Sequence, residues 1–164
     1  MKATRGWLVG AVVFLSGMSA HAEEVVLVSS FIPYDTEATE SEDVRKECTW
    51  NTTMPRYLAK ESQGRVKIAE QSIETIKDKK LALVATYVHT AGGGGWSGPK
   101  WLVLQGTLTE GSKLLGTFEA RRQTIRGSMR ACGTLESLSE DIADDILRWL
   151  NTPSVDAKLG DARK

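Results

Sequence analysis

Residues 101–122, which read WLVLQGTLTEGSKLLGTFEARR, decide the fold. Leu102, Leu104 and Leu108 share one face of a strand expected over 101–109. Residues 110–113 form a tight turn, and residues 114–122 return as the partner strand. The pattern therefore predicts an antiparallel hairpin with one leucine-lined face.

Three more segments have the composition of strands. Residues 81–88 are apolar at almost every position, which predicts a central strand covered on both faces. Residues 24–32 are rich in β-branched side chains and predict a buried strand. Residues 65–70 alternate between polar and apolar, which indicates a half-exposed strand that extends towards Ile76. The last four strands along the chain are expected to form an antiparallel meander.

Two helices are expected. The first runs near 53–63, with Thr52 or Thr53 as its N-cap and Pro55 in its first turn. The second runs from about 134 to 151 and begins at Thr134. Its apolar stripe consists of Leu135, Leu138, Ile142, Ile146, Trp149 and Leu150.

The order β-α-β-β-β-β-α predicts an α+β fold, an antiparallel sheet of about five strands with two helices on one face. The polar, acidic residues 33–47 are interpreted as a surface loop. A single domain is expected over 23–152, followed by a flexible tail over 153–164 that has few apolar anchors.

The first 22 residues have the pattern of a secretory signal peptide. Lys2 and Arg5 precede an uncharged, mostly apolar stretch over 7–18, and Ala-His-Ala follows at 20–22. The alternative is a retained anchor, but a membrane-spanning helix needs roughly 20 apolar residues. Cleavage after Ala22 is expected, with export to the periplasm. No later segment is apolar enough to span a bilayer, so no transmembrane segment is expected in the mature chain.

The two cysteines, Cys48 and Cys132, both lie in the expected mature chain. Two cysteines in an exported chain predict one structural disulfide. The alternative is a redox pair or a reactive thiol, but the chain has no C-x-x-C motif. The bridge would join the segment that precedes the first helix to the segment that precedes the second.

The overall charge is balanced, with 21 basic and 21 acidic side chains in 164 residues. A nucleic-acid-binding protein usually carries a strong basic excess, so no nucleic-acid partner is expected. Without residues 1–22, His89 is the only histidine left. A general base needs an orienting partner and a nucleophile, and nothing near His89 in the sequence fixes both, so no catalytic residue is predicted.

Residues 92–100, GGGGWSGPK, form the most unusual segment. Pro99 separates Gly98 from Lys100 and also replaces the final glycine of G-x-S-x-G, so neither a P-loop nor a nucleophile elbow fits. The segment remains a glycine-rich loop with an indole at Trp96. That indole could dock a partner, a sugar or a lipid headgroup. The alternative is that Trp96 folds back onto the sheet.

Four arginines follow within ten residues, with no acid among them. They could bind an anionic glycan, a lipid headgroup or an acidic protein. The alternative is local pairing with acids of the last helix, which are Glu140, Asp141, Asp144 and Asp145. The predicted contact surface consists of Trp96, Ser97, Lys100, Trp101, Arg121, Arg122, Arg126 and Arg130.

The acids of the last helix do not indicate a metal site. Their one-turn spacing occurs on any acidic helix, no histidine accompanies them, and Asp144 with Arg148 has the spacing of an ordinary ion pair. A solvated helix face is expected, and no metal or cofactor.

Three segments together resemble a group of small exported proteins of Gram-negative bacteria without an assigned function. The segments are the 92–100 loop, residues 116–122 (GTFEARR), and Cys132 followed by residues 145–150 (DILRWL). The resemblance covers roughly the C-terminal half. It implies a periplasmic or envelope location and brings no catalytic residues with it.

The sequence therefore favours a non-enzymatic binding or accessory module of the cell envelope, with a protein, glycan or lipid headgroup as its partner. One alternative is a small hydrolase or glycan-active enzyme that uses His89 with Ser97 or with an acid from elsewhere in the chain. The other is a structural subunit that self-associates through an exposed strand edge.

Overall fold

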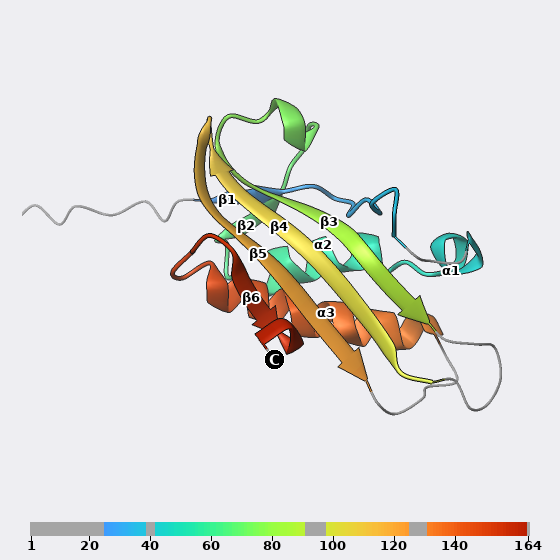
Figure 1. Ribbon diagram of the computed structural model, residues 1–164. Helices are drawn as coiled ribbons and strands as arrows, with labels where there is room; N and C mark the ends of the chain where they lie inside the picture. The colour runs from blue at the N-terminus through green and yellow to red at the C-terminus, as the bar shows by residue number, and fades with distance from the viewer. Residues whose placement is uncertain (1–24, 39–41, 91–97, 125–130, 164) are drawn as a thin grey trace, which may run out of the picture.

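The computed structural model describes residues 25–38, 42–90, 98–124 and 131–163 (Figure 1). Within these residues, one six-stranded sheet has the order β2-β1-β3-β4-β5-β6. Its strands are β1 Val26–Val28, β2 Val66–Ile68, β3 Lys79–Thr90, β4 Lys100–Glu110, β5 Lys113–Thr124 and β6 Ala157–Gly160. The helices are α1 Glu42–Glu47, α2 Trp50–Glu61 and α3 Ala131–Trp149, with short 3-10 helices η1 Ile73–Thr75 and η2 Asp161–Arg163. The predicted α+β class is confirmed.

The centre of the sheet is the antiparallel meander β3-β4-β5. The hairpin expected from residues 101–122 is present, and its turn contains Gly111 at φ +56°. Leu102, Leu104 and Leu108 are fully buried on one face of β4, as their spacing predicts.

The outer strands correct the expectation of a purely antiparallel sheet. β1 runs parallel to β2 and β3, and β5 runs parallel to β6. Parallel neighbours need a crossover connection, and α2 lies between β1 and β2 while α3 lies between β5 and β6. The strand expected over 65–70 is therefore not part of the meander, and it stops at Ile68 instead of extending towards Ile76.

Helices α2 and α3 pack side by side against the same face of the sheet (Figure 1). The α3 stripe is buried as predicted from Leu135 to Trp149, and Leu150 is partly buried. The prediction that the central strand is covered on both faces is wrong. In β3 only Leu81, Ala85 and Val88 are buried, because both helices pack against the face of the sheet to which these three side chains point.

The N-terminal half differs from the sequence prediction in two places. Helix α1 lies within the expected surface loop, and α2 begins at Trp50 rather than near residue 53. Pro55 is therefore inside α2, where its missing N–H leaves the carbonyl of Asn51 without its helical donor. The backbone N–H of Ile32 donates to that carbonyl at 2.9 Å, so the proline creates the acceptor that ties the segment after β1 to the helix.

The expectation of a tail without anchors beyond residue 152 is also corrected. Residues 157–160 form β6 along the edge of β5, and Leu159 is buried in the core. Gly160 has φ +59°, and a Cβ there would lie 2.8 Å from both Arg122 and Asp145. The backbone of β6 therefore packs closely against an ion pair between the sheet and α3.

The predicted disulfide is confirmed between Cys48 and Cys132. It joins the residue just after α1 to the first turn of α3, across 84 positions of sequence. A loop of this length corresponds to about 4–5 kcal/mol in the chain-entropy model, as an upper estimate.

We expect the Cys48→Ser, Cys132→Ser double variant to lose about 2–5 kcal/mol of unfolding free energy, because the unfolded chain regains the freedom that the bridge removes. Urea denaturation with and without reductant measures the loss. Equal midpoints for the oxidised wild type and the double variant would contradict a stabilising role.

Tyr57 of α2 donates its hydroxyl hydrogen bond to Asp144 of α3 at 3.2 Å. Partial burial, together with the negative charge of Asp144, raises the pKa of the Tyr57 phenol above 10.0. The neutral phenol is thus the form that the folded state favours.

This raised pKa predicts a pH effect with a definite sign. The contribution of Tyr57 to stability is complete below pH 10.0 and is lost as the pH rises through the folded-state pKa. The unfolding free energy of the wild type should therefore fall more steeply above pH 10.0 than that of Tyr57→Phe. If plots of unfolding free energy against pH stay parallel for the two proteins, the ionisation of the Tyr57 phenol is not coupled to unfolding.

Candidate functional site

The face of the sheet opposite the helices carries the candidate site. Cross-strand pairing aligns His89 with Trp101 and Trp101 with Gln123 across β3, β4 and β5. One step along, Tyr87 aligns with Val103 and Val103 with Arg121. A register shift between Ala85 and Tyr87 keeps these side chains on the open face, opposite the buried leucines. We call this surface the open sheet face.

Three rings form a compact cluster on the open sheet face. His89 stacks on Trp101 with ring centroids 4.5 Å apart and an interplanar angle of 23°. The ring of Tyr87 lies 6.3 Å from each of the other two and nearly parallel to them. All three side chains are half-buried, although the described helices all lie away from them. We call Tyr87, His89 and Trp101 the aromatic row.

Arg121 extends the aromatic row towards β5. Its guanidinium lies over the Trp101 ring at 5.8 Å from the centroid, and one terminal nitrogen donates to the side-chain oxygen of Gln123 at 3.0 Å. Its Nε is buried and has no hydrogen-bond partner. Among the described residues no carboxylate forms an ion pair with Arg121. The open sheet face thus holds a positive charge that no described side chain neutralises at contact distance.

The stacking decides what the aromatic row can recognise. Because β3 and β5 flank β4 on opposite sides, His89 and Arg121 approach the indole of Trp101 from its two sides. A sugar or a base would therefore compete with one of these two side chains on either face of the ring. The row instead presents a ridge of ring edges that is held rigidly by its own stacking. Trp, Tyr and Arg in such settings are the residues that contribute most to protein–protein contacts.

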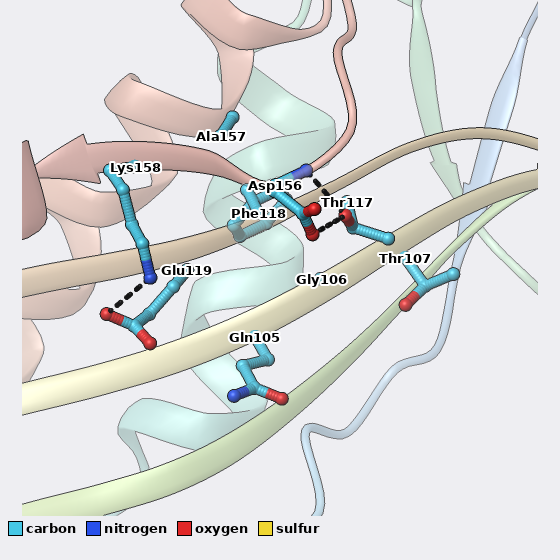
Figure 2. A pocket seen from close by; sticks show the side chains of 9 residues that line it. All are labelled: Gln105, Gly106, Thr107, Thr117, Phe118, Glu119, Asp156, Ala157 and Lys158. Carbon is cyan, nitrogen blue, oxygen red and sulfur yellow. Dashed lines mark hydrogen bonds and ion pairs between the residues drawn. The ribbon is translucent and has the colours of Figure 1, made fainter.

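A hollow of about 370 Å³ lies at the other end of the same face. Figure 2 shows its side chains around the backbone of Gly106, with Gln105 and Thr107 projecting from β4. Lys158 and Glu119 form an ion pair at 3.3 Å along its border, and the backbone N–H of Asp156 donates to the Thr117 hydroxyl at 2.8 Å. Most of its lining groups are polar, and none of them is an aromatic ring on this face.

The structure brings together only part of the predicted contact surface. Trp101 and Arg121 are in contact on the open sheet face. Lys100 is 1% exposed, and the side chain of Arg122 turns to the helix side of the sheet, so both are removed from this surface. The remaining predicted residues lie outside the described part of the chain: Trp96, Ser97, Arg126 and Arg130.

Arg122 and its neighbour Arg121 have opposite environments because successive strand residues face opposite ways. Arg122 donates to Asp145 through Nε at 2.8 Å and through a terminal nitrogen at 2.6 Å. Arg148 contacts the other oxygen of Asp145, which is only 4% exposed. The alternative of local pairing with α3 is thus realised at Arg122, and Arg148 pairs with Asp145 rather than with Asp144.

His89 makes ring contacts only, and no hydroxyl or carboxylate of the described residues hydrogen-bonds to its imidazole. The described residues also contain no group of three or more His, Cys, Asp or Glu side chains arranged to hold a metal ion. The helices in the described ranges lack the combination of length and apolarity needed to cross a membrane.

Sequence reasoning did not place Tyr87, His89 and Gln123 in one cluster with Trp101. The sequence signal for this cluster was the number of apolar residues in 81–88, which is larger than one buried strand face requires. Alternate residues of that segment face away from the helices, and Tyr87 is one of them.

No family model and no curated protein matches the chain. Among solved structures, the chain is similar to the crystal structure of protein XCC0632 from Xanthomonas campestris, which is assigned to family DUF330. The TM-score is 0.44 and the identity 13%, over 78% of this chain and 81% of that chain. That neighbour is a bacterial protein of unknown function, and a likeness at this level does not transfer a function.

The contrast between the two arginines predicts different effects of the same substitution. Arg122→Ala should lower the unfolding free energy by about 1–3 kcal/mol, because buried Asp145 then loses a charged donor. Arg121→Ala should change it by less than about 1 kcal/mol, as is typical of surface changes. Denaturation curves of both variants measure this, and equal losses would show that the two side chains share one environment.

Proposed function

We propose that the protein is a non-enzymatic binding module of the cell envelope and that the open sheet face is its contact surface. The observation that supports this most directly is the aromatic row beside Arg121 on a sheet face that none of the described helices covers. Exposed rings cost free energy in water unless a partner covers them, and their rigid stacking limits the entropy lost when they bind.

A protein partner fits this surface better than a sugar or a lipid headgroup. Stacking on sugars requires a free ring face, and both sides of the Trp101 indole are approached by His89 and Arg121. A ridge of ring edges with an adjacent guanidinium suits the mixed apolar and polar surface of a protein. The location in the envelope is supported by the leader-like residues 1–22 and by the Cys48–Cys132 disulfide.

The two alternatives receive less support. The enzyme alternative requires an acid, base or nucleophile next to His89, and the described residues provide only ring contacts there. Self-association through a strand edge is opposed at both edges of the sheet. The Ser62 hydroxyl bonds both the N–H and the carbonyl of Val66 in β2, and Arg163 donates to the Lys158 carbonyl in β6.

Site-directed photo-crosslinking in the native host tests the proposal. A photo-reactive phenylalanine at Gln105, which is exposed on the open sheet face, should give a discrete protein adduct. The same residue at Arg56, which is exposed on α2, is the matched control on the helix side and should give no such adduct.

Adding Trp101→Ala or Arg121→Ala should reduce the adduct from position 105, because each removes part of the contact surface. An adduct of equal yield from positions 56 and 105, or one that both substitutions leave unchanged, would contradict the proposed surface.

A further inference from the structure

We propose that the open sheet face pairs with the same face of a second copy of this chain. The inference rests on the proposed function, in which this face is a protein contact surface, and it names the partner. Its basis is that the two ends of the face are complementary to each other. The aromatic row lies on β3 and β4 at one end, and the small side chains of Ala82 and Thr107 lie on the same two strands at the other.

The strand register defines where a two-fold axis would pass. Leu104 pairs with Ala120 at the midpoint between the Trp101–Gln123 pair and the Thr107–Thr117 pair. We place the two-fold axis at this midpoint, perpendicular to the strands and parallel to the sheet. Each strand then lies opposite the same strand of the second copy, and the two strands run in opposite directions. In such an isologous contact each residue faces the one at the mirrored position of the partner. Two sheets related in this way have aligned strands, as in a β-sandwich.

This axis brings opposite charges together. Arg121 and Glu119 lie one position on either side of Ala120 and point to the open sheet face. Arg121 would therefore face the partner's Glu119, and the symmetric contact would form at the same time. Arg121 has no ion-pair partner among the described residues, so its charge is available. Glu119 pairs with Lys158 through one oxygen, and a carboxylate can accept from a second cation.

The same axis matches large side chains with small ones. Trp101 of β4 would face the partner's Thr107, at the edge of the hollow. His89 of β3 would face the partner's Ala82, because Ala82 pairs with Thr107 just as His89 pairs with Trp101. His89 and Trp101 would thus each meet a small side chain of the partner.

The size of the face sets the strength of the pairing. Three strands with seven facing positions and β6 with four, each position about 4.8 Å by about 3.4 Å, project to about 410 Å². Stable interfaces bury about 800 Å² on each partner, so the pairing should be weak and reversible.

The test uses the chain purified after export with its disulfide formed. Sedimentation velocity from about 10 μM to about 1 mM covers the range expected for a small interface. The wild type should form a reversible dimer. Arg121→Glu alone places two acids against each other at both contacts, and Glu119→Arg alone places two arginines there. Each should raise the dimer dissociation constant at least about tenfold.

The deciding sample is an equimolar mixture of these two variants. In a mixed dimer, Glu at position 121 of one chain faces Arg at position 119 of the other, and the second contact pairs Glu119 with Arg121. Association should therefore return to the wild-type range, although each variant alone associates at least about tenfold more weakly. Arg56→Glu on α2 makes the same charge change on the helix side and should leave association unchanged. Circular dichroism melting checks that all variants fold.

Three outcomes would overturn the inference: a wild type that stays monomeric over the whole range, single variants that associate like the wild type, or a mixture that stays monomeric. The first outcome leaves the proposed function standing if position 105 still cross-links to a different protein in cells. Failure of both experiments would reject the contact surface itself.

Discussion

Both long helices cross over the same face of the sheet, and the rest of the structure depends on this constraint. β1 and β5 run in the same direction, and their crossovers lead towards opposite edges. Two crossovers have opposite handedness when they start from strands of the same direction, lead to opposite edges of the sheet and place their helices on the same face. One of the two is therefore of the uncommon left-handed kind. The Cys48–Cys132 bridge joins the starts of both helices and so holds this arrangement together.

A one-sided helix layer gives the two faces of each strand different chemistry. On the helix side, Arg122 is fixed by the buried carboxylate of Asp145. On the other side, Arg121 rests on an indole and forms no ion pair with a carboxylate of the described residues. The two neighbouring arginines thus have separate roles, one in holding α3 and β6 to the sheet and one in the proposed contact surface. At both edges of the sheet, side chains of Ser62 and Arg163 bond backbone groups of the outer strands.

Local patterns predicted the elements that depend on neighbours in sequence. The 101–122 hairpin, the apolar stripe of α3 and the single disulfide all follow from spacing or from cysteine count. The place of β2 and β6 could not be predicted in this way, because short strands contribute few side chains to a pattern and their partners are set by crossovers. A stretch as short as 157–160 contains one buried side chain, Leu159, and gives no period to detect.

The candidate site was predicted only in part for a related reason. Residue type alone selected Trp101 and Arg121, which are in contact, together with Lys100 and Arg122, which face elsewhere. Strand alternation places Arg121 and Arg122 on opposite faces of the sheet. The register shift near Ala85 decides which residues of β3 lie on the same face as Trp101 and Arg121. The composition of residues 81–88 gives no sign of that shift.

The strand order also has a consequence for assembly of the chain. The meander β3-β4-β5 joins neighbours in sequence, whereas β1 and β6 reach its two edges from far along the chain. Distant pairings form slowly, so the meander has two uncovered edges until both arrive. Uncovered edges can pair with those of other molecules, and aggregation during folding should start at β3 and β5. A truncation that ends before Ala157 would make one of these edges permanent, even though it removes only a few residues from the end of the chain.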